Sequence, residues 1–156
     1  MQGLKVMMAL INNWDLKTDN NKVAKREKKT GQDSNLRIYY TSDLGGTFGT
    51  TGSFFRKLPF FKNAPAGTKG NPEGYATDKF ISGVKNGEVV FNYSGKDPET
   101  LRGIKVENAR WIGDWLAKLS DKQLSDAFTS AGYDLQNVAI YVKAVKDRIA
   151  ELENLK

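Results

Sequence analysis

The chain has 156 residues, 39% of them hydrophobic, and a formal net charge of +6, which is the size and composition of one globular domain spanning residues 1–156. It contains neither cysteine nor histidine, which excludes disulfides, thiolate nucleophiles, imidazole general bases and most transition-metal sites. Any chemistry must therefore come from carboxylates, amides, hydroxyls, Lys and Arg, and this inventory suits Mg²⁺ and phosphates.

The first predicted element is a helix near the amino terminus. Residues 4–11 are apolar almost all round and contain no Gly or Pro, which predicts a buried helix. Asn12 and Asn13 are expected to end it, because their side chains compete for backbone hydrogen bonds. The apolar run is too short to span a membrane and lacks a cleavage pattern, so we expect a soluble, cytoplasmic protein without a membrane span.

A β-hairpin is predicted next. Residues 22–26 and 36–41 flank a polar, Gly-containing tip at 28–35, and the second arm is rich in β-branched and aromatic residues. The first arm and the tip carry a basic cluster, which we interpret as an exposed turn and which consists of Lys22, Lys25, Arg26, Lys28 and Lys29.

Nucleic-acid binding through this hairpin is an open alternative. The basic cluster lies beside Arg37, Tyr39 and Tyr40, and basic residues next to aromatic ones can follow a nucleic-acid backbone and stack its bases. Strand alternation is expected to send Tyr39 and Tyr40 to opposite faces. The two rings would then not form one stacking platform, which makes nucleic acid an unlikely partner.

A long loop and a short extended region follow the hairpin. Residues 45–74 hold seven glycines, three of the four prolines and five phenylalanines, a composition typical of a functional loop. Residues 80–81 are predicted as a short helix or extended piece. Residues 88–93 are predicted as a strand, after a turn at 85–87.

The remainder is predicted to be helical. A stripe of Ile112, Trp115, Leu116 and Leu119 predicts a helix over 106–119. Ser120 and Gln123 have the spacing of a capping box, which opens a helix through 128 that Gly132 can close.

The last predicted helix spans residues 135–155, and its apolar stripe consists of Val138, Val142, Val145, Ile149 and Leu152. We expect this stripe to pack on the chain's own domain, with a coiled-coil partner as the alternative. The expected fold is α+β and mainly helical, with one β-hairpin and a C-terminal helical bundle.

Two motifs carry the functional signal. Asp15 stands two residues before Lys17 and five before Asn20, and the hairpin is followed by Asp43-Leu44-Gly45. This pattern resembles the D-L-K-x-x-N catalytic loop and the D-F-G motif of protein kinases, in the order of a kinase C-lobe. The resemblance covers the first third of the chain and is closest to divergent kinases, including lipid-kinase-like and bacterial kinase-like proteins.

The resemblance assigns a role to each motif residue. Asp15 would orient the attacking hydroxyl, and Lys17 would neutralise charge on the transferred phosphoryl group. Asn20 and Asp43 would hold Mg²⁺, and both would contact Mg-ATP together with Lys17. Taken alone, residues 15–21 also fit a simple polar turn that ends a helix.

The chain departs from the kinase pattern in identifiable ways. Asn13 and Trp14 replace the His and Arg of the usual triplet, and no Gly-rich loop or V-A-I-K-type strand Lys of an N-lobe appears. We therefore expect the C-lobe of a phosphotransferase, inactive until an N-lobe or a partner protein completes the ATP site. The alternative is a non-catalytic, pseudokinase-like interaction module that binds protein through the Phe-rich loop or the last helix.

Overall fold

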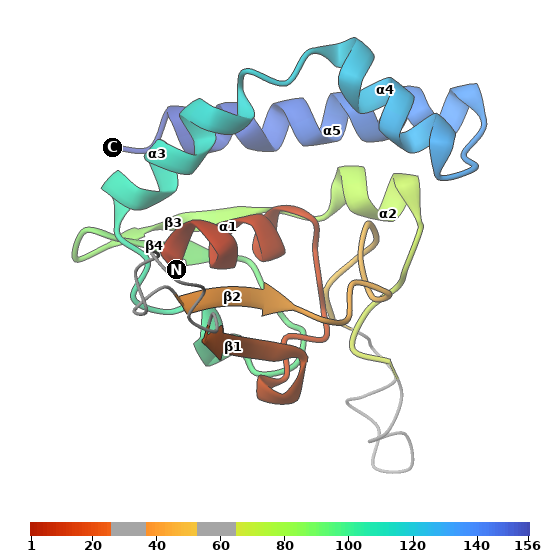
Figure 1. The fold of residues 1–156 in the computed structure, drawn as a ribbon. Coiled ribbons are helices and arrows are strands. Elements are labelled where there is room, and N and C mark those ends of the chain that lie inside the picture. Colours follow the sequence, from red (N-terminus) through yellow and green to blue (C-terminus); the bar gives the residue numbers. More distant parts are fainter. Residues whose placement is uncertain (26–36, 53–64) are drawn as a thin grey trace, which may run out of the picture.

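A computed structural model of the chain describes residues 1–25, 37–52 and 65–156. The fold is α+β, as expected, and its two sheets in the described ranges are separate antiparallel pairs, β1–β2 and β3–β4. The elements are α1 (Gln2–Leu10), η1 (Thr18–Asn20), β1 (Asn21–Lys25), β2 (Arg37–Thr41), α2 (Pro72–Thr77), β3 (Ile81–Lys85), β4 (Glu88–Phe91), η4 (Pro98–Leu101), α3 (Val106–Leu116), α4 (Asp121–Ser130) and α5 (Leu135–Glu153). In Figure 1 the three C-terminal helices gather on one side of α1, and the β1–β2 hairpin lies on the other.

Helix α1 is the buried amino-terminal helix that the sequence predicts. Val6, Met8 and Leu10 lie in the core, whereas Met7 is partly exposed, so burial is not complete all round. The helix stops because Asn12 adopts a left-handed conformation with φ of 51°, which Asn tolerates better than most residues.

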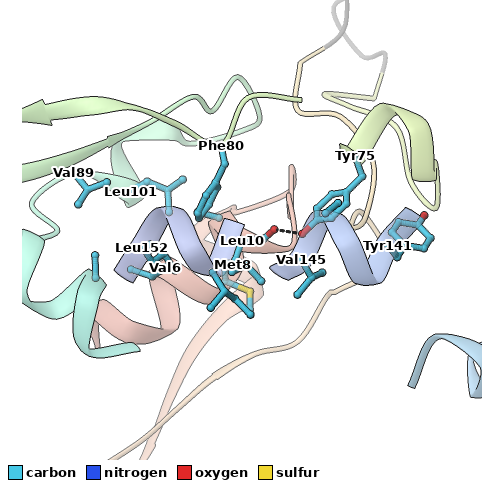
Figure 2. Packing of buried hydrophobic residues seen from close by; sticks show 14 of the residues in the cluster. Val6, Met8, Leu10, Tyr75, Phe80, Val89, Leu101, Tyr141, Val145 and Leu152 are labelled. Atoms are coloured by element: carbon cyan, nitrogen blue, oxygen red, sulfur yellow. Dashed lines mark hydrogen bonds between the residues drawn. The ribbon is translucent and has the colours of Figure 1, made fainter. Parts of the chain in front are cut away.

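Helix α5 packs its apolar stripe against the chain's own domain, as expected. Every residue of the stripe is buried, and Val145 and Leu152 face the side chains of α1 (Figure 2). The Asp134 side chain caps the helix by accepting the Asn137 N–H at 2.9 Å, a standard helix start. This stripe is therefore covered, and it is not available for a coiled coil.

Helices α3 and α4 follow the prediction in part. The Ser120–Gln123 capping box is present, and Gly132 ends the helix with φ of 91°. The buried stripe expected for α3 is wrong at Trp115, which is 54% exposed. The helix instead buries Gly113, where an added Cβ would lie 2.8 Å from Leu152, so α3 approaches α5 closely at this glycine.

Both hairpins are antiparallel. In the first, Asn21 pairs with Thr41 and Lys25 with Arg37, as expected, while its predicted tip at 26–36 lies outside the described residues. The second hairpin, β3–β4, was not expected, because the sequence predicted only one. Its turn residues Asn86 and Gly87 both have positive φ, 53° and 75°, as a two-residue type I′ turn requires.

A buried arginine joins α5 to the ends of α1 and α2. One terminal nitrogen of Arg148 donates to the Leu10 carbonyl at 2.9 Å and to Asn12 Oδ1 at 2.7 Å. The other donates to the carbonyls of Tyr75 at 2.9 Å and Asp78 at 3.0 Å. Burial lowers the pKa of Arg148, and its guanidinium stacks on the Tyr75 ring at 3.9 Å.

The first prediction concerns this arginine. Arg148→Met should lower the free energy of unfolding by about 3–5 kcal/mol, because it leaves several buried carbonyls without donors. Urea unfolding measures the change, with Arg110→Met on the exposed surface of α3 as the control. Equal losses in the two variants would contradict the structural role of Arg148.

Candidate functional site

The two motif loops meet through Asn13. This side chain is fully buried; its Oδ1 accepts the Asp15 N–H at 3.1 Å, and its Nδ2 donates to the Asp43 carbonyl at 3.2 Å. Beside it, the backbone N–H of Trp14 donates to the Gly46 carbonyl at 3.0 Å. The loop that carries Asp15 and the loop that carries Asp43 therefore lie side by side.

The β1–β2 hairpin closes this junction from the other end. It begins directly after Asn20 and ends directly before Ser42, and the Ser42 N–H donates to the Asn20 carbonyl at 2.8 Å. Asn20 Nδ2 in turn donates to the Asp15 carbonyl at 3.0 Å. The structure thus brings Asp15, Asn20 and Asp43 to one place, although 28 residues separate the two acids.

Two lysines flank the Asp15 carboxylate. Lys17 Nζ lies 3.3 Å from Oδ2 and Lys96 Nζ lies 3.3 Å from Oδ1. The Lys96–Oδ1 contact is an ion pair without a hydrogen bond, because this buried oxygen has no hydrogen-bond partner among the described residues. Lys17 is the predicted residue; Lys96 is not signalled by any motif in the sequence.

The pKa of Lys17 lies above its ordinary value. The cause is the Asp15 carboxylate beside it, through hydrogen bonding and its negative charge, with a smaller contribution from Asp43. Lys17 therefore keeps its positive charge at neutral pH.

The indole of Trp14, in place of the usual Arg, packs against two glycines. A Cβ added at Gly46 would lie 2.8 Å from the ring, and one added at Gly67 would lie 2.7 Å from it. The loop that follows Asp43 can approach the indole only because these positions carry no side chain.

Asn20 and Asp43 are the magnesium ligands that the sequence predicts. Asp43 Oδ1 accepts the Gly45 N–H at 2.9 Å, and Asn20 Nδ2 donates to the Asp15 carbonyl at 3.0 Å. The side-chain oxygens left for a cation are therefore Asp43 Oδ2 and Asn20 Oδ1. The described residues contain no cluster of three or more His, Cys, Asp or Glu able to hold a metal ion. Two protein oxygens nevertheless suffice for Mg²⁺, which keeps waters and binds substrate phosphates.

An apolar groove of about 280 Å³ lies next to the site, between α1, the β1–β2 hairpin and η4. Tyr39 and Tyr40 both line it, with Leu4, Met8, Leu16 and Val23 among the other residues. The expectation that strand alternation sends the two tyrosine side chains to opposite faces stays a prediction.

Comparisons with known proteins give no match, whether made with family models, with curated sequences or with solved structures. No helix in the described ranges combines the length and apolar character needed to cross a bilayer. The functional argument therefore depends on the residues of the site themselves.

The second prediction tests the junction of the loops. Asn13→Asp should lower the free energy of unfolding by about 2–3 kcal/mol, because it removes the donor to the Asp43 carbonyl and buries a carboxyl group. The same exchange at the exposed Asn154 should cost less than about 1 kcal/mol. Chemical denaturation of both variants measures the difference, and similar losses would show that Asn13 does not hold the two loops together.

Proposed function

We propose that this chain is the metal- and phosphate-binding part of a kinase-like phosphotransferase, completed by a further lobe or a partner protein. The observation that carries the proposal is the contact between the two motif loops, in which Asn13 donates to the Asp43 carbonyl at 3.2 Å and Trp14 to the Gly46 carbonyl at 3.0 Å. Phosphoryl transfer needs a hydroxyl-orienting carboxylate and a metal-binding carboxylate facing one phosphate. Two adjoining loops that each carry an Asp support this arrangement.

Each residue has a role that its surroundings support. Asp15, mostly buried and flanked by ammonium groups, orients the acceptor hydroxyl. Lys17 remains protonated and offsets charge on the transferred phosphoryl group. Asn20 and Asp43 would hold Mg²⁺, which when bound with ATP neutralises phosphate charge.

The surface beside the site supports the need for a completing lobe. Val23, Ile38, Tyr39 and Tyr40 of the β1–β2 hairpin are all at least 40% exposed. Exposed apolar residues gathered on one element next to a functional site are typical of a binding interface. We infer that the completing lobe covers this hairpin and supplies the rest of the nucleotide pocket.

A non-catalytic, pseudokinase-like interaction module is the second candidate. The observation that favours it is an exposed aromatic pair on α3, where the rings of Trp111 and Trp115 lie 6.4 Å apart and are more than half exposed. Tryptophan is enriched at protein interfaces. The apolar stripe of α5, by contrast, is buried and does not serve this role. Four of the five phenylalanines of the Phe-rich loop lie outside the described residues.

The third prediction separates the two candidates. Asp43→Ala should abolish Mn²⁺-dependent binding of ATP, because it removes the carboxylate that the proposal assigns to the metal. Water-proton relaxation with Mn²⁺ and millimolar ATP measures this binding, and Asp114→Ala, an exposed acid on α3, is the matched control. Unchanged binding in Asp43→Ala would rule out the phosphotransfer site and favour the interaction module.

The fourth prediction concerns the chain by itself. Calorimetry with Mg²⁺ and ATP should give an affinity weaker than micromolar, a level that corresponds to about −8 kcal/mol, because much of the nucleotide would lie outside this chain. Micromolar or tighter binding would contradict the need for a completing lobe.

A further inference from the structure

Lys96 reaches the site from a distant part of the sequence, in the loop after β4. Its backbone N–H donates to the Trp14 carbonyl at 2.8 Å, and its backbone pairs with Asp15 as an isolated parallel bridge. The ammonium group lies 3.3 Å from Asp15 Oδ1 and 5.5 Å from the centre of the Trp14 ring. Both its main chain and its side chain are therefore directed to the catalytic-loop candidate.

The loop that carries Lys96 is closely fitted to the Asp15 loop. The Tyr93 hydroxyl lies 3.0 Å from the carbonyls of both Asn13 and Lys96. Burial raises the pKa of Tyr93, so the phenol stays protonated and donates to these carbonyls. Gly95 must be glycine here, because an added Cβ would clash with the Tyr93 hydroxyl and lie 2.7 Å from the Trp14 carbonyl.

Two ammonium groups share one carboxylate at this point. One carboxylate, that of Asp15, faces both Lys17 and Lys96. The two lysines also line an open polar depression of about 540 Å³. Asp19 and Asp97 also lie in its wall but form no ion pair with either lysine in the described part of the chain. The groups of this depression that can bind an anion are therefore the two lysines, at its Asp15 end.

We propose that Lys96 is a second phosphate-binding cation of the site, acting with Lys17. Its ammonium group exchanges Asp15 Oδ1 for an oxygen of the bound phosphate, and this exchange frees Oδ1 to accept a hydrogen bond from the acceptor hydroxyl. Oδ1 is buried and has no hydrogen bond among the described residues, so it has an acceptor position to offer. The inference rests on the proposed function and adds the residue that the motifs do not contain.

The test uses Lys96→Met, which removes the charge and keeps most of the side-chain volume, with Lys105→Met as the matched control. Lys105 is exposed, and its Nζ lies 3.8 Å from Oε1 of Glu107, its partner in an ion pair. The full chain is titrated at fixed low salt with two separate probes, tripolyphosphate without metal and Mn²⁺ without phosphate. Backbone amide shifts in NMR spectra locate the tripolyphosphate.

Lys96→Met should weaken tripolyphosphate binding by about tenfold, since the lost contact is charge-assisted but partly exposed, and should leave Mn²⁺ binding unchanged. Tripolyphosphate should shift the amides of Asp15, Lys17 and Lys96 in the parent chain, and Lys105→Met should bind it as the parent does. Tripolyphosphate binding equal in both variants overturns the inference, and so does a joint loss of both probes, which would make Lys96 a purely structural support. Failure of the proposed function is seen separately, as Mn²⁺ binding that survives Asp43→Ala.

Discussion

The site depends on one buried cation, the guanidinium of Arg148. A buried charge is tolerated only where its hydrogen-bonding groups are satisfied, and here the acceptors are backbone carbonyls at the ends of α1 and α2 together with the side chain of Asn12. Asn12 extends the network by donating to the Gly49 carbonyl at 2.6 Å and to Asp78 Oδ2 at 2.9 Å. The end of α1 is thereby fixed against α5, α2 and the loop that follows Asp43.

This arrangement explains how a short polar loop becomes a defined site. The loop leaves α1 at the residue that Arg148 holds, and the next residue, Asn13, is buried between α1 and the Asp43 loop. The same end of the helix is also tied by Tyr75, whose hydroxyl donates to the Leu10 carbonyl at 2.7 Å (Figure 2). Functional groups held by packed and hydrogen-bonded neighbours keep their geometry, and this is the condition that the proposed phosphoryl transfer would place on Asp15 and Asp43.

Local signals in the sequence predicted much of this fold. The apolar run of α1, the Ser120–Gln123 capping box, the stripe of α5 and the first hairpin each depend on residues close together in the chain, and each is present. The second hairpin was missed although Asn86-Gly87 is a strong turn signal. The buried face of α3 was predicted wrongly because Trp115 is apolar by type and was expected in the core. The residue that lies against α5 is Gly113, which carries no apolar signal in the sequence.

Contacts between distant segments were out of reach of the sequence. Arg148 and Lys96 are ordinary charged residues by type, and nothing near them in the sequence indicates that one is buried and the other meets Asp15. The kinase-like interpretation, drawn from spacing alone, stays a proposal.

The measurement that tests it most directly is the loss of amide signals in a ¹⁵N-labelled chain titrated with Mn²⁺, since the paramagnetic ion broadens nearby resonances. The account predicts that Asn20, Ser42 and Asp43 broaden first while α5 is unaffected; broadening centred on any other acidic surface would contradict a shared cation site at the two loops.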